Sequence, residues 1–113
     1  MKIIAQLHEQ PWSPLIKLYL HYVPHRRQHN VIIQKYREAL YKAIAKTGFR
    51  MPYGGPIELD VVLVNPESPD LGNSYLMIER CFDGKALKPP FILDDDSQIQ
   101  VLHMTKMYTP GKP

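Results

Sequence analysis

The sequence predicts a small single-domain α/β (α+β) protein, with a mixed four-stranded sheet and two helices in the order ββαβαβ. The 113 residues suit one domain with one hydrophobic core. Residues 15–23 and 57–64 alternate in the way that strands with one better-buried face do. Two other segments carry apolar residues at helical spacing.

The first half of the chain predicts two strands and a helix. Residues 1–14 begin as an apolar strand and end in a proline-containing loop, and residues 15–23 form the second strand. A helix begins near Asn30, whose side chain suits an N-cap, and Gly48 stops it. The apolar face of this helix comprises Ile33, Tyr36, Leu40 and Ile44.

The second half predicts two further strands around a helix. The strand at residues 57–64 is apolar on both faces in its second half, which favours a central place in the sheet. A helix over about residues 73–82 follows, with Tyr75, Ile78 and Phe82 on one face. Residues 99–107 form the last strand.

Composition limits the cellular context. No apolar run approaches the roughly 20 residues that a membrane span needs, and the N-terminal apolar run is too short for a secretory signal. We therefore expect a cytoplasmic protein without a membrane partner. The single cysteine, Cys81, excludes an internal disulfide and argues against a cysteine-based zinc site. A formal net charge of +3 allows a polyanionic partner.

Acidic residues occur at two places in the sequence, each next to a predicted strand. Asp70 follows the strand at residues 57–64 and opens the second helix, while Asp94, Asp95 and Asp96 precede the last strand. Carboxylates from two such places are able to hold Mg²⁺ against a phosphate. If the last strand pairs beside the strand at residues 57–64, these acids approach Asp70. The alternatives are an acidic turn on a solvated surface and a helix-capping role for Asp70 or Asn73.

Other catalytic patterns are absent from the sequence. It contains no G-x-S-x-G elbow, no phosphate-binding P-loop and no dinucleotide-binding glycine pattern. The five histidines lack the tight spacing of a zinc site, and we expect His25 and His29 to be surface residues.

Two motifs give the chain a resemblance to a known family. Residues 69–84 read P-D-L-G-N-S-Y-L-M-I-E-R-C-F-D-G, and residues 95–99 read D-D-S-Q-I. In this register, without a gap, the chain resembles the RusA family of Holliday-junction resolvases. The segment Y-V-P-H-R-R at residues 22–27 is similar to the end of that family's first strand. The resemblance divides the chain into an N-terminal extension (1–15), a RusA-like domain (16–108) and a tail (109–113).

The resemblance implies a homodimer that cleaves branched DNA with Mg²⁺, or Mn²⁺ as the alternative ion, in recombination and repair. It implies catalytic and metal-binding roles for Asp70, Asp96 and the neighbouring Asp95. Asn73 matches the motif asparagine and is expected at the DNA. The other residues expected to contact DNA are Arg26, Arg27, Arg80, Lys85 and Lys88.

Three positions depart from the family pattern. Gly72 stands where the family has a second aspartate, Leu76 where it has a catalytic lysine, and Arg80 where it has a further aspartate. Glu79 or Asp83 is in place to supply a substitute carboxylate for the metal, and Arg80, Lys85 or Lys88 a substitute charge. Glu79 has the simpler interpretation of an exposed helix residue.

Three functions follow from these residues. The first is a structure-selective endonuclease with a rearranged site. The second is a catalytically weak or inactive relative that binds branched DNA or a protein partner as a homodimer. The third is an unrelated α/β binding module whose acidic loop merely binds cations.

Overall fold

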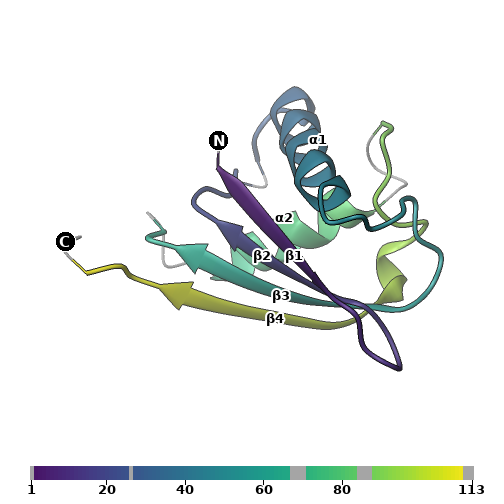
Figure 1. Ribbon diagram of the computed structural model, residues 1–113. Coiled ribbons are helices and arrows are strands. Elements are labelled where there is room, and N and C mark those ends of the chain that lie inside the picture. Colours follow the sequence, from purple (N-terminus) through teal and green to yellow (C-terminus); the bar gives the residue numbers. More distant parts are fainter. Residues whose placement is uncertain (1, 26, 67–70, 84–87, 111–113) are drawn as a thin grey trace.

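The structure, a computed structural model, describes residues 2–25, 27–66, 71–83 and 88–110. The chain forms one domain of four strands and two helices, which confirms the predicted fold class and element order. Figure 1 shows how these elements are arranged. The elements are β1 (Ile3–His8), β2 (Leu15–Leu20), α1 (Asn30–Ala45), β3 (Ile57–Val64), α2 (Leu71–Phe82), the short 3-10 helix η1 (Asp96–Gln98) and β4 (Ile99–Met107).

The four strands form one mixed sheet in the order β1-β2-β3-β4. Strand β1 pairs antiparallel with β2, whereas β2, β3 and β4 run parallel to one another. The segment assigned to an N-terminal extension thus contributes β1 to the sheet. Strand β3 lies between β2 and β4, and this confirms the central place that its two apolar faces predict.

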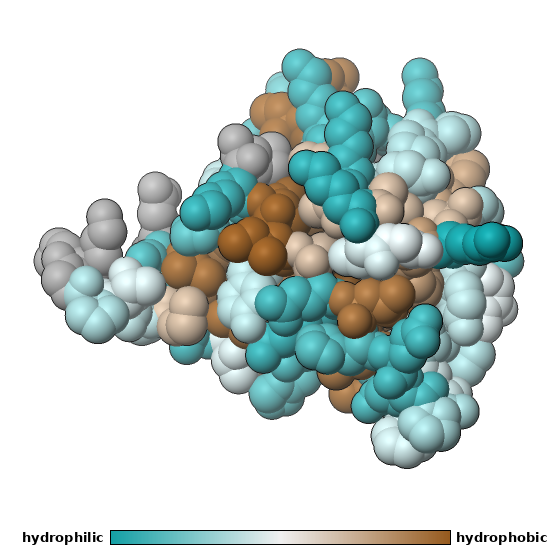
Figure 2. All heavy atoms as spheres, viewed as in Figure 1, coloured by the Kyte–Doolittle hydropathy of each residue, from teal (hydrophilic) through white to brown (hydrophobic). Residues whose placement is uncertain are grey.

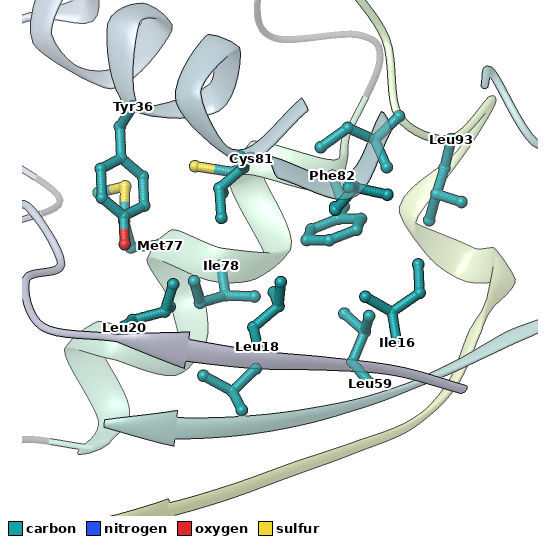
Figure 3. Packing of buried hydrophobic residues seen from close by; sticks show 14 of the residues in the cluster. Ile16, Leu18, Leu20, Tyr36, Leu59, Met77, Ile78, Cys81, Phe82 and Leu93 are labelled. Carbon is teal, nitrogen blue, oxygen red and sulfur yellow. The ribbon is translucent and has the colours of Figure 1, made fainter. Parts of the chain in front are cut away.

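Both helices lie on the same face of the sheet. The connections β2–α1–β3 and β3–α2–β4 each move one strand in the same direction, so right-handed crossovers put α1 and α2 on one side. Figure 3 shows side chains from the two helices packed against those of β2 and β3. The four α1 residues predicted to face the core, Ile33, Tyr36, Leu40 and Ile44, are at most 1% exposed.

The opposite face of the sheet carries charged and exposed apolar residues. Asp60 on β3 lies 3.9 Å from Lys17 on β2 and 3.5 Å from His103 on β4. Ile4 and Val101, which flank these charges on the outer strands, are 42% and 47% exposed. In the view of Figure 2, hydrophobic areas are small and separated by hydrophilic residues.

The second strand is shorter than predicted. It ends at Leu20, although the apolar pattern continues to Val23. The Tyr22 carbonyl accepts a hydrogen bond from the Tyr36 hydroxyl of α1. This contact turns the backbone toward the helix layer and ends the ladder with β3.

Both helices also differ from expectation near their first turns. Asn30 is not the N-cap of α1: His29 is, without a side-chain cap hydrogen bond, and the Asn30 side chain instead accepts a bond from Arg80. Helix α2 begins at Leu71, before the predicted start at about residue 73. The prediction that Tyr75 shares the apolar face of α2 is wrong, because Tyr75 is 41% exposed while Ile78 is fully buried.

Neither helix in the described part of the chain combines the length and the apolar character that crossing a membrane requires.

Candidate functional site

The acidic segment before β4 has a defined local structure. Asp95 caps η1, because its Oδ1 accepts the backbone N–H of Ser97 at 3.0 Å while its own N–H donates to Gln98 Oε1 at 2.7 Å. The Gln98 amide also donates to the carbonyls of Tyr53 and Gly55, both at 2.7 Å. This capping box ties the start of β4 to the loop before β3. Asp95 therefore fixes the backbone that presents Asp96.

Glu79 of α2 and Asp96 of η1 interact electrostatically across two elements that contact each other, and we refer to them as the carboxylate pair. Asp96 opens η1, Glu79 lies on α2, and both are half-buried. Burial raises the pKa of the Glu79 carboxyl, and the neighbouring Asp96 raises it further. A divalent cation between two such carboxylates offsets their repulsion. Two carboxylates completed by substrate phosphate and water are a ligand set that Mg²⁺ uses, so these residues fit that ion.

The third member of the acidic run, Asp94, is exposed to solvent. Its Oδ2 lies against Gly54, only 3.0 Å from the position that a Cβ atom would take there. Asp94 therefore contacts the loop before β3, and it serves below as a matched control for Asp96.

The predicted partnership of Asp70 with Asp96 stays a prediction, because Asp70 lies outside the described residues. The last strand does pair with β3, as that prediction requires, but the two strands are parallel. Asp96 precedes β4 and so lies at the edge where β3 begins. Glu79 lies about 12 Å along the α2 axis from Leu71, the first residue of the helix. Across the residues that the structure describes, no three His, Cys, Asp or Glu side chains gather as a metal site.

Two residues predicted to contact DNA lie near the start of α1. Arg80 of α2 donates from Nη2 to Asn30 Oδ1 at 2.8 Å. Arg27 is exposed, and its backbone N–H donates to His25 Nδ1 at 3.1 Å. Two further predicted contacts, Arg26 and Lys85, lie outside the described residues.

Lys88 and Asn73 occupy different surroundings. The Gln34 side chain of α1 donates to the Lys88 carbonyl at 2.9 Å and accepts the Lys88 backbone N–H at 3.0 Å. Lys88 is exposed. Asn73, in contrast, lies in a cavity at the other end of α2. The first half of α1 thus brings together Arg80 and Lys88, but not Asn73.

The cavity lies where β2 and β3 end, beside the first turn of α2, at the arrowheads in Figure 1. Its volume is about 300 Å³. The described lining residues are Leu20, His21, Tyr22, Val23, His25, Gln28, Leu63, Pro66, Asn73 and Ser74. Sequence reasoning missed Tyr22, His25 and Gln28 as a site. The available signal was an aromatic and basic segment directly after a strand, at the edge where open α/β sheets bind ligands.

The outer face of α2 is apolar where the family pattern is catalytic. Leu76, at the lysine position, is 46% exposed, and Tyr75 and Leu71 are 41% and 36% exposed. Gly72, at the second aspartate position, is also exposed. Leu76 and Gly72 therefore lie on the solvent-facing side of α2 and outside the core.

The fold and the site together define a class of protein: a two-layer α/β domain with a surface carboxylate pair and a polar cavity at the ends of its parallel strands. Comparison of the chain with protein-family models, curated proteins and solved structures found no match.

Proposed function

We propose that the protein is a Mg²⁺-dependent, structure-selective endonuclease that cleaves branched DNA such as Holliday junctions. The observation that carries this proposal is the proximity of Glu79 to Asp96, which raises the pKa of Glu79. Glu79 is, with Asp83, one of the two substitute carboxylates that the departures at Gly72 and Arg80 lead us to expect. The substrate class comes from the resemblance of residues 69–84 and 95–99 to the RusA family.

Each residue of the proposed site has a separate role. Glu79 and Asp96 hold the divalent cation, and Asp95 fixes the turn from which Asp96 projects. The ion, when bound, lowers the pKa of a water molecule and neutralises charge on the scissile phosphate. Arg80, oriented by Asn30, and the exposed Lys88 attract the phosphate backbone.

A homodimer suits the paired cuts that resolve a junction. The sheet face opposite the helices supports self-association, because it combines exposed Ile4 and Val101 with both charges of the Lys17–Asp60 pair. Light scattering on the purified protein distinguishes a dimer from a monomer of 13.1 kDa.

The test is cleavage of a four-way junction by the purified protein with Mg²⁺ or Mn²⁺. We expect Glu79→Gln and Asp96→Asn to abolish cleavage while binding persists, and Asp94→Asn to cleave as the wild type does. Junction binding should weaken steeply with salt, because each phosphate contact releases counterions. Absence of cleavage with either metal, or equal activity of wild type and Glu79→Gln, contradicts the enzyme.

A second candidate is a catalytically weak or inactive homodimer that binds branched DNA or a protein partner. The exposed apolar residues Leu71, Tyr75 and Leu76 favour it, because together they form an apolar surface suited to protein contact. Tight, salt-sensitive junction binding without cleavage under either metal supports this candidate over the enzyme.

A further inference from the structure

The cavity at the carboxyl ends of β2 and β3 has the composition of a nucleotide site, and its residues take no part in the carboxylate pair. We infer that it binds one nucleotide, with the base stacked on Tyr22 and the phosphate bonded by His25 and Gln28. Within the proposed function, on which this inference rests, the occupant is an unpaired nucleotide of branched DNA. A free mononucleotide presents the same base and phosphate.

Tyr22 supplies an oriented aromatic surface. Its ring meets the buried Tyr36 edge to face, with centroids 6.2 Å apart and planes at 76°. The Tyr36 hydroxyl also bonds to the Tyr22 carbonyl, so both the ring and the backbone of Tyr22 are held. The residue nevertheless remains 48% exposed and lines the cavity. A fixed, accessible aromatic ring is the platform on which unpaired bases stack, whatever their sequence.

His25 supplies a hydrogen-bond donor, and its other hydrogen bond indicates which ring nitrogen donates. Its Nδ1 accepts the backbone N–H of Arg27 at 3.1 Å. Neutral imidazole has one donor and one acceptor nitrogen, so the proton is on Nε2, which is left to donate to a ligand. The backbone N–H of Gln28 donates to the His25 carbonyl at 2.9 Å, which holds these two lining residues on one turn.

The rest of the lining agrees with a nucleotide. Leu20 and Leu63, at the ends of the two strands, provide an apolar part, and the side chains of Asn73 and His21 add polar groups. The volume of about 300 Å³ lies at the lower end of small-molecule sites, which suits one nucleotide.

The test is an NMR titration of the full-length ¹⁵N-labelled protein with dAMP, with a short oligothymidylate and with inorganic phosphate. We expect dAMP and the oligothymidylate to shift the backbone amides of Tyr22 and Gln28 and the ring Nε2 of His25. Tyr22→Ala should weaken dAMP binding about tenfold or more, the scale of one lost stacking contact. Tyr108→Ala, which removes an exposed tyrosine outside the cavity, should bind as the wild type does.

Conservative variants keep the result interpretable if Tyr22→Ala fails to fold. Tyr22→Phe retains the stacking surface and should bind dAMP normally, whereas Tyr22→Leu should not. His25→Ala should weaken binding, and His29→Ala, outside the lining, should not. Shifts confined to other surfaces, or equal affinity of Tyr22→Leu and Tyr22→Phe, overturn the inference. So does phosphate alone reproducing every shift, which would indicate an anion site without a base.

The nucleotide site and the junction endonuclease are contradicted by different results. If dAMP occupies the cavity while a four-way junction is neither bound nor cleaved, the nucleotide site stands and the junction endonuclease does not. If the junction is bound and cleaved while the cavity signals stay unshifted and Tyr22→Leu cleaves normally, the endonuclease stands and the nucleotide site does not.

Discussion

Arg37 is a fully buried cation, and we expect its replacement to destabilise the fold. It lies on α1, is 0% exposed, and donates from Nε to the Pro90 carbonyl and from Nη1 to the Asp83 carbonyl, both at 2.9 Å. Its guanidinium carbon lies 4.7 Å from the centroid of the Phe91 ring. Burial lowers the pKa of the guanidinium, although its proton remains bound at neutral pH. Arg37 thus joins α1 to the segments on both sides of residues 84–87.

The magnitude of the effect follows from these contacts. Each hydrogen bond to a charged group contributes about 1.5–3 kcal/mol, and Arg37→Leu leaves two carbonyls without their donor. The leucine also removes the desolvation cost of Nη2, which has no partner among the described residues. We therefore expect a loss of roughly 2–4 kcal/mol in the free energy of unfolding.

Urea denaturation of the wild type, Arg37→Leu and Arg37→Lys measures this loss. Arg37→Lys should recover only part of it, because an ammonium does not reproduce the planar set of donors. Arg50→Leu, at an exposed arginine, is the matched control and should change stability little. The reasoning is refuted if Arg37→Leu is as stable as the wild type, since the two bonds would then only balance the cost of burying the charge.

Four further predictions concern single residues. Trp12, Ser13 and Gln10 donate hydrogen bonds to the Glu58 carboxylate and lower its pKa. The stability that this carboxylate contributes is therefore present above its pKa in the unfolded chain and is lost as pH falls through its pKa in the folded protein. Glu58→Gln should remove this acid transition, which is followed by the fluorescence emission of Trp12, the single tryptophan. Because the pKa of Glu79 is raised in the folded protein, the wild type loses stability as pH rises from the pKa of this group in the unfolded chain to its pKa in the folded protein. Glu79→Gln should therefore be more stable than the wild type above this pH range and not below it. Urea titrations at several pH values measure the difference. Burial raises the pKa of Cys81 to about 12, so an aromatic disulfide reagent should label it only as fast as the domain opens. Leu76→Lys restores the charge expected at that position and should speed junction cleavage by about tenfold to a hundredfold in single-turnover assays.

Each of these has a contradicting result. An unchanged acid transition of Trp12 emission in Glu58→Gln rejects the role of that carboxylate. A stability difference between wild type and Glu79→Gln that is constant with pH rejects a raised pKa. Labelling of native Cys81 at the rate of a small free thiol rejects its burial. Unaltered cleavage by Leu76→Lys shows that the position does not face the reacting phosphate.

The strands and helices were predictable where one local pattern decides the outcome. Strands β3 and β4 match their predicted bounds, because alternation over eight or nine residues leaves little freedom of register. Strand β2 was predicted too long, because the hydrogen bond between Tyr36 and Tyr22 joins residues far apart in the chain. The burial of Arg37 was not predicted, because arginine is ordinarily exposed and only the assembled fold supplies the carbonyls that allow its burial.

The candidate site was predictable in its residue types and not in its arrangement. The sequence marked Asp70 and Asp96 as the main carboxylates and Glu79 or Asp83 as the substitute; of these, Glu79 and Asp96 interact electrostatically in the structure, while Asp70 lies outside the described residues. Strand direction decides which end of the sheet each acidic segment reaches, and no periodicity encodes it. The parallel pairing of β3 with β4 therefore separates Asp96 from the edge where β3 ends, and the cavity containing Tyr22 and His25 occupies that edge instead.

The most direct test of the central claim is paramagnetic broadening by Mn²⁺ in the ¹⁵N-labelled protein. Substoichiometric Mn²⁺ should broaden the amide signals of Glu79 and Asp96 selectively, because their carboxylates would hold the ion in the proposed site. Glu79→Gln should abolish the selective broadening, and Asp94→Asn should leave it in place. Broadening centred on another part of the chain, or equal broadening in the wild type and Glu79→Gln, contradicts a metal site at this pair and removes the basis for the proposed endonuclease.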